Sequence, residues 1–139
     1  MTPRQIIRVN KSLCSGCRIC ELVCSIYHEG VINPEKAGIA IARDYDQLQC
    51  IPQVCRLCRK PKCIEACQLG ALRQDPETRL IWINQDLCNG CGLCVEACPF
   101  HAIHYNKEVK KIYVCDQCQG KFLCIVFCPK NALELVEVT

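Results

Sequence analysis

The sequence predicts an α+β fold in which short strands and short helices surround four cysteine-rich loops. Seventeen of the 139 residues are cysteine, well past the level of about 8–10% at which cysteine dictates a scaffold. Sixteen of the seventeen fall into four groups of four, and a similar unit of strand, cysteine loop, helix and Ala-aliphatic tail recurs along the chain. An internal repeat of this kind defines an architecture more firmly than local propensity does.

The third group is the most regular of the four. Residues 88–99 read C-x2-C-x2-C-x3-C-P, the run by which bacterial ferredoxins hold iron–sulfur clusters. Cys98 follows one helical turn after the first three cysteines and faces away from them, so in two-cluster ferredoxins the corresponding cysteine ligates the other cluster. Gly90 and Gly92 suit such a loop, because close approach of the backbone to a cluster favours residues without a Cβ.

The other three groups are variants of this run. The first has the same spacing with Ser25 in place of the proline, the second is widened within residues 59–62, and the fourth is widened further and ends in Pro129. The sixteen grouped cysteines are the candidate cofactor ligands: Cys14, Cys17, Cys20 and Cys24; Cys55, Cys58, Cys63 and Cys67; Cys88, Cys91, Cys94 and Cys98; Cys115, Cys118, Cys124 and Cys128.

Local patterns place the ligand loops between regular elements. Stretches 4–9, 38–43, 79–84 and 111–114 combine β-branched or alternating residues and predict short strands. A helix over about residues 18–27 is expected to carry Cys24. We interpret residues 25–54 and 101–114 as connectors.

Composition limits the classes of protein that remain. With one Trp, three Phe and four Tyr, the apolar core is thin, and a thin core needs disulfides or metal. Disulfides require an oxidising compartment, whereas residues 1–20 show no secretory leader and the cysteine count is odd. We therefore expect a cytoplasmic protein. The longest apolar run, 122–128, is far below the roughly 20 residues that span a bilayer, so we expect no direct membrane insertion.

The formal net charge of +3 does not predict nucleic-acid binding. It treats every thiol as neutral, whereas a [4Fe-4S] cluster with four thiolates carries about −2. Four such clusters would change +3 to about −5. Zinc is the structural alternative, since zinc sites also use C-x2-C pairs, but usually as two pairs separated by a longer spacer. Iron content and visible absorbance that bleaches on reduction separate the two readings.

The order of tight and widened groups resembles the four-cluster electron-transfer subunits of the dimethyl-sulfoxide-reductase type, over residues 4–138. The resemblance implies tandem ferredoxin-like modules of the bacterial two-cluster kind, one inserted within the other: an outer module of 1–54 and 101–139 and an inner module of 55–100. It also implies that groups pair from the outside in. The implied ligand sets are Cys14, Cys17, Cys20 and Cys128; Cys115, Cys118, Cys124 and Cys24; Cys55, Cys58, Cys63 and Cys98; Cys88, Cys91, Cys94 and Cys67.

The resemblance implies a non-catalytic subunit with four [4Fe-4S] clusters that passes electrons between a larger catalytic redox subunit and ferredoxin or a flavin subunit. The catalytic subunit is expected to be of the molybdenum or tungsten type. The short chain is similar to the small subunits of soluble complexes, such as those that serve tungsten-dependent aldehyde oxidoreductases. Alternatives are a freely diffusing polyferredoxin, or a subunit of a hydrogenase, formate dehydrogenase or carbon monoxide dehydrogenase. Head-to-tail self-association is a further hypothesis. An enzyme with an open iron site would need an incomplete ligand set, which sixteen well-spaced cysteines oppose.

Residues outside the groups carry weaker predictions. Cys50 is the unpaired seventeenth cysteine, and we interpret it as a buried small hydrophobe. The three histidines, at 28, 101 and 104, lack an evident partner, although His101 could lie near a cluster. Trp82 and Tyr105 are expected to pack within strands.

Overall fold

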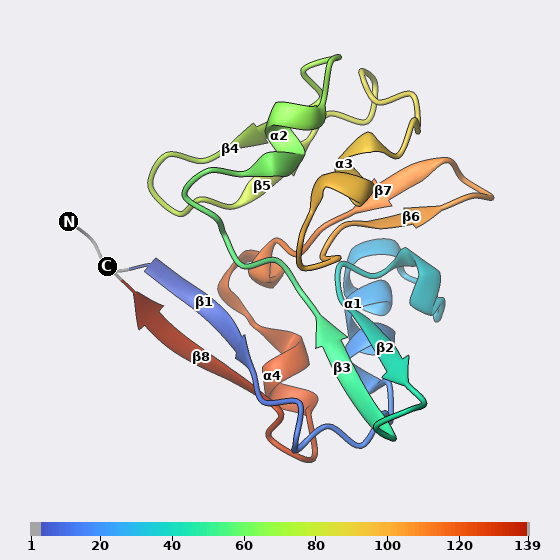
Figure 1. The fold of residues 1–139 in the computed structure, drawn as a ribbon, viewed down its shortest axis with the longest axis vertical. Coiled ribbons are helices and arrows are strands. Elements are labelled where there is room, and N and C mark those ends of the chain that lie inside the picture. Colours follow the sequence, from blue (N-terminus) through green and yellow to red (C-terminus); the bar gives the residue numbers. More distant parts are fainter. Residues whose placement is uncertain (1–3, 139) are drawn as a thin grey trace.

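The computed structural model describes residues 4–138 and consists of small two-stranded sheets and short helices (Figure 1). The first strand, β1 (Arg4–Val9), pairs antiparallel with the last, β8 (Leu133–Val138), so that the two ends of the described chain lie together. The remaining elements are α1 (Ile19–Glu29), η1 (Pro34–Lys36), β2 (Ala40–Asp44), β3 (Gln49–Gln53), α2 (Lys62–Ala66), β4 (Leu72–Gln74), β5 (Ile81–Ile83), α3 (Leu93–Ala97), β6 (His104–Asn106), β7 (Lys111–Tyr113), η2 (Gln117–Gly120) and α4 (Leu123–Phe127).

Three of the four sheets are hairpins with turns of one design. Strands β2–β3, β4–β5 and β6–β7 are each joined by a turn in which an Asp or Asn side-chain oxygen accepts the backbone N–H groups two and three residues later. Four residues after that Asp or Asn, each turn has a residue with left-handed backbone geometry. The three pairs are Asp44 with Leu48, Asp75 with Arg79, and Asn106 with Lys110.

Two hydrophobic cores divide the molecule into two lobes. The first core includes Ile7, Ile39, Val54 and Leu133, where α1 packs against α4. The second core includes Leu72, Ile81, Ile103 and Ile112, where α2 packs against α3. We call them the α1–α4 lobe and the α2–α3 lobe.

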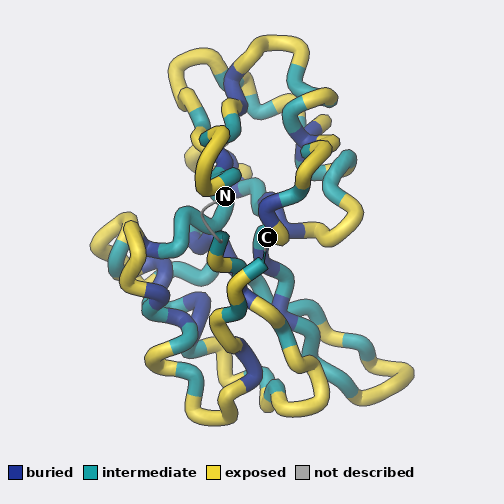
Figure 2. Tube along the Cα trace, turned by 90° about the vertical axis from the view of Figure 1, so that its left-hand side faces the viewer, coloured by how far each residue is buried: buried dark blue, intermediate teal, exposed yellow. Residues whose placement is uncertain are grey.

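The lobes lie one above the other in Figure 1, and the β6–β7 hairpin lies between α3 and α1. Through Ile103 and Ile112, this hairpin region belongs to the core of the α2–α3 lobe. In Figure 2 the loops at the far ends of both lobes are mostly exposed, and the buried residues form short segments between them. No helix within residues 4–138 has the length and apolar character needed to cross a membrane.

The predicted elements are present with shifted ends. Strands form within or beside all four predicted stretches, and α1 covers the predicted helix and continues to Glu29. Residues 25–54 and 101–114 are more ordered than connectors, because they contain the β2–β3 and β6–β7 hairpins. The packing role expected for Trp82 is wrong, since its side chain on β5 is 54% exposed. Tyr105 packs against the second core as expected.

Candidate metal centres

Cysteines from different groups meet around shared pockets. In each of three pockets, three thiols come from one loop and the fourth comes from the end of a distant group. The three sets are Cys14, Cys17 and Cys20 with Cys128; Cys55, Cys58 and Cys63 with Cys98; Cys115, Cys118 and Cys124 with Cys24. Because every pocket draws on two groups, the groups are not self-contained sites of the zinc-ribbon kind.

The four grouped cysteines that remain, Cys67, Cys88, Cys91 and Cys94, gather in the α2–α3 lobe. Cys94 lies close enough to Cys88 and Cys67 for their charges to interact, and all three border the second core. Cys91 belongs to the same loop and is exposed. Cys17 has the corresponding place in the first group and is also exposed.

Short helices deliver the distant thiols. Cys67, Cys98 and Cys128 each occupy the first extended position after a five-residue helix, α2, α3 and α4 respectively. Pro99 and Pro129 follow two of these ends, where a proline cannot continue the helix.

Cys24 differs from these three cysteines because it lies inside a helix: α1 continues for five residues beyond it. Ser25, where the other tight group has proline, is fully buried inside that helix. Its hydroxyl donates to the carbonyl of Leu22 at 2.9 Å and accepts the N–H of Asn33 at 3.2 Å. A proline at this position would break the helix, so the departure from the repeated pattern has a structural cause.

Backbone N–H groups point at several of the sulfurs. The N–H of Ala71 donates to Cys67 Sγ and that of Ala102 to Cys98 Sγ, both at 3.4 Å. The N–H of Gly38 donates to Cys24 Sγ at 3.3 Å. Such bonds favour the charged thiolate. The alanine that lies four residues after Cys67 and after Cys98 in the sequence repeat therefore marks a donor to sulfur.

Burial acts in the opposite direction on several of the thiols and raises their pKa. Burial raises the pKa of Cys20 and of Cys124 to about 12, and neighbouring thiols add to the effect. The pKa values of Cys55 and Cys63 rise to about 11, again chiefly through burial. At Cys67 burial is outweighed by backbone N–H groups of residues 69–72, and the pKa is lowered.

A bound cation favours the thiolate form and so opposes the effect of burial on the thiols whose pKa is raised. All seventeen cysteines lie within the described residues and are free, without disulfides. Four thiols converging on an apolar pocket, with N–H donors aimed at sulfur, are a donor set that fits a [4Fe-4S] cluster.

One thiol of each set lies close enough to a thiol of the next set for their charges to interact, and this defines an order. Cys20 interacts with Cys124, Cys115 interacts with Cys55, and Cys94 interacts with Cys63. The four sets consequently lie in a row, from the set of Cys14 through those of Cys115 and Cys55 to that of Cys88. The exposed residues Cys17 and Cys91 belong to the two ends of this row.

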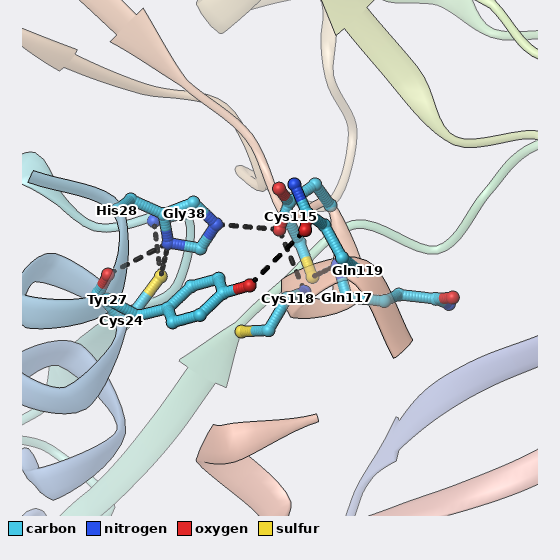
Figure 3. Close-up of polar contacts among 9 residues, drawn as sticks. Cys24, Tyr27, His28, Gly38, Cys115, Gln117, Cys118 and Gln119 are labelled. Atoms are coloured by element: carbon cyan, nitrogen blue, oxygen red, sulfur yellow. Dashed lines mark hydrogen bonds and ion pairs between the residues drawn. The ribbon is translucent and has the colours of Figure 1, made fainter. Parts of the chain in front are cut away.

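Hydrogen bonds of His28 and Asp116, which we call the polar lock, join α1 to the fourth group (Figure 3). The imidazole of His28 contacts the carbonyl oxygen of Cys24 through Nδ1 at 2.8 Å and Asp116 Oδ1 through Nε2 at 2.7 Å. The hydrogen bond to Asp116, followed by that to Cys24, raises the pKa of His28 to about 11. The Asp116 carboxylate also accepts the N–H of Cys118 at 2.8 Å.

This lock was missed by sequence reasoning, which found no partner for His28. The available signal was spacing, because His28 follows Cys24 by one helical turn and Asp116 follows Cys115 directly. The other two histidines have simpler surroundings. His104 Nε2 contacts the carbonyl oxygen of Gln53 at 3.3 Å, and His101 lines an open groove rather than any of the three thiol pockets described above.

Glycines in the two tight loops make room for side chains. A Cβ on Gly16 would lie 2.6 Å from Cys50 Sγ, and a Cβ on Gly90 would lie 3.0 Å from the hydroxyl of Tyr105. The sequence explained Gly90 by close approach to a cluster alone, and the structure adds a neighbouring side chain at Gly90 and at Gly16. Cys50 is half-buried rather than buried.

Known proteins resemble this chain in sequence and fold. Residues 46–138 match the 4Fe-4S dicluster domain. The polyferredoxin-like subunit of an aliphatic sulfonate oxidoreductase from Pyrococcus furiosus is 34% identical, over 95% of this chain and 76% of the relative. A probable anaerobic dimethyl sulfoxide reductase chain of Escherichia coli K12 is 27% identical, over 96% of this chain and 74% of the relative.

The fold is also similar to that of a chain in the BamBC active-site complex of benzoyl coenzyme A reductase, solved with zinc. The TM-score is 0.58 at 20% identity, and the match covers 100% of this chain and 82% of the other.

Proposed function

Because the chain belongs to the 4Fe-4S dicluster domain family, we propose that it is an iron–sulfur electron-transfer subunit that relays electrons between a larger catalytic oxidoreductase subunit and ferredoxin or a flavin subunit. The observation that carries the proposal is the row of four thiol sets, in which one thiol of each set lies close enough to a thiol of the next for their charges to interact. Iron–sulfur clusters transfer electrons at potentials tuned by charge, hydrogen bonds to sulfur and exposure. A row with an exposed cysteine at each end suits entry at one end and exit at the other.

We further propose that each set holds one [4Fe-4S] cluster, with the sixteen grouped cysteines as iron ligands. The pocket linings support the swapped assignment, in which the fourth cysteine of each group completes another group's site. The proposed modules remain an outer one of 1–54 and 101–139 and an inner one of 55–100. Packing of Ile103 and Ile112 in the second core argues for extending the inner module to the end of the β6–β7 hairpin.

The similar proteins support a large partner. One of these relatives is a subunit of an aliphatic sulfonate oxidoreductase, and another is a probable anaerobic dimethyl sulfoxide reductase chain. We propose by analogy that this chain serves a molybdenum or tungsten enzyme in the cytoplasm and is itself non-catalytic. A tungsten-dependent aldehyde oxidoreductase is one such enzyme.

The first experiment is anaerobic measurement of iron and acid-labile sulfide per chain, beside purification of the tagged chain from its own cells. We expect about sixteen of each, as four cubanes require, together with a co-purifying catalytic subunit. Full iron without a partner would favour a freely diffusing polyferredoxin. Zinc without sulfide would overturn the proposal. Light scattering on the purified protein tests head-to-tail assembly, which predicts a mass that grows with concentration.

A further inference from the structure

The turn between β2 and β3 differs from that between β6 and β7 in the kind of side chain it exposes. The β6–β7 turn has Lys107 and Lys110 in the first and fourth positions after its capping Asn106. In the same two positions the β2–β3 turn has Tyr45 and Leu48. The backbones match, since Leu48 and Lys110 have φ values of 52° and 54°.

Folding alone does not account for this pair. Tyr45 is 79% exposed and Leu48 is 89% exposed, so neither side chain stabilises a core. Leu48 also has left-handed backbone geometry, which favours Gly or Asn over a branched aliphatic residue. Two large apolar side chains are held in water on a turn whose backbone the β6–β7 turn forms with lysines, which indicates a contact outside the chain.

The turn stands beside one end of the row of thiol sets. Arg43 and Cys50, which pair across β2 and β3 next to the turn, cover Gly16 in the loop between Cys14 and Cys17. In Figure 1 the tip of this hairpin reaches the same end of the molecule as the chain entering α1. The adjoining pocket, which holds the terminal set of Cys14, is also lined by Ile41 and Pro52 of the hairpin.

The charges around this pocket are mainly positive. Arg18 and Lys130 line it, and its described lining contains no carboxylate. Arg18 Nε donates to Glu21 at 2.6 Å. The turn itself has two carboxylates, Asp44 and Asp46, of which Asp44 is engaged in capping the turn.

We propose that the β2–β3 turn is a docking prong, through which the terminal set of Cys14 faces a redox protein with an apolar recess and carboxylates around its own electron-transfer group. Tyr45 and Leu48 enter the recess, and Arg43 and Lys130 face the carboxylates. Buried aromatic and aliphatic anchors supply most of the affinity of such an interface, while opposite charges orient the encounter. One electron crosses, so that one protein is oxidised as the other is reduced and no bond changes.

The test uses the full chain with its clusters, expressed with a tag from its own locus and purified without oxygen. The probe is the catalytic subunit that co-purifies, quantified per tagged chain. Tyr45→Lys/Leu48→Lys recreates the lysines of the β6–β7 turn and should reduce retention at least tenfold. The matched control, Lys107→Gln/Lys110→Gln, should retain the subunit fully. Lys130→Glu should weaken retention and make it less sensitive to salt.

The outcomes separate this inference, which rests on the proposed function, from that function itself. If the wild-type chain retains no large subunit, the proposed role in a larger complex is wrong, and the docking prong, which requires that subunit, is wrong with it. If the wild type retains one and the lysine variant retains it equally, the docking prong is wrong. Tyr45→Ser/Leu48→Asn, which suits the turn geometry, should give the same loss with unchanged iron content. A photo-crosslinker at position 45 should label acidic peptides of the large subunit, and labelling of a second copy of this chain would overturn the proposal.

Discussion

The α1–α4 lobe is built from longer elements than the α2–α3 lobe. Its first helix has eleven residues and its β1–β8 ladder has six residue pairs, whereas α2 and α3 have five residues each and the β4–β5 ladder has three pairs. The first lobe also contains polar links between distant segments, including Arg8 with Glu134 and His28 with Asp116. Each lobe nevertheless surrounds two thiol sets.

The difference indicates how each lobe is stabilised. Apolar burial and hydrogen bonds within the chain contribute to the α1–α4 lobe before any metal binds. Elements as short as α2 and β4 are marginal by themselves, so the α2–α3 lobe depends more on its metal centres. When binding free energy is folding free energy, the two lobes should respond unequally to loss of iron.

The largest expected effect is therefore that of removing iron. Anaerobic chelation should abolish hydrogen-exchange protection throughout β4–β5 and β6–β7, because the centres that hold these strands are lost. Residual protection should persist in the β1–β8 ladder and in α1. The measurement is hydrogen exchange with mass spectrometry on the holo and apo chains. Equal loss of protection in both lobes would show that the length of the elements does not matter.

A second prediction concerns the buried carboxylate of Glu21 in the α1–α4 lobe. Glu21 is 2% exposed, and its two oxygens accept from Arg18 Nε and from the N–H of Ile41, both at 2.6 Å. Glu21→Ala leaves a backbone donor unpaired and should cost about 2–3 kcal/mol of unfolding free energy. Glu65→Ala, on the exposed face of α2, should cost little. Denaturant unfolding of the holo protein compares the two, and equal costs would contradict the assignment.

The repeat allowed the thiol chemistry to be predicted from the sequence. Polar contacts between segments far apart in the chain could not be predicted in this way. Ligand groups, four strand regions and the helix that carries Cys24 follow from local spacing and period. His28 and Asp116 are 88 residues apart, so no local pattern pairs them. Trp82 alternates correctly for a strand, but a two-stranded sheet covers one face only and leaves this residue outside. Cys50 could not be placed because its neighbour, Gly16, belongs to another segment.

A third and smaller effect is expected at the polar lock of His28 and Asp116 in the α1–α4 lobe. His28→Ala removes the hydrogen bonds to Asp116 and to the carbonyl of Cys24, at an expected cost of about 1–2 kcal/mol. It also removes a polar partner 3.6 Å from Cys24 Sγ, so the midpoint potential of one centre should fall. Potentiometric titration followed by electron paramagnetic resonance measures the shift. The control His101→Ala, at an exposed position, should leave all potentials in place; a purely structural role for His28 predicts no selective shift.

The smallest predicted effect separates local backbone strain from the unequal support of the two lobes. Leu48 lies in the hairpin of the α1–α4 lobe, and Lys110 lies in the hairpin next to the second core, yet both have the same left-handed geometry. Asn tolerates that geometry, so Leu48→Asn and Lys110→Asn should each add about 0.5–1 kcal/mol of stability. Hydrogen exchange at the flanking strands measures both gains. Because the backbone strain belongs to the turn, the two substitutions should stabilise their hairpins by similar amounts although the lobes differ. A gain in stability confined to one hairpin would show that the lobe, and not the turn, controls the opening of its strands.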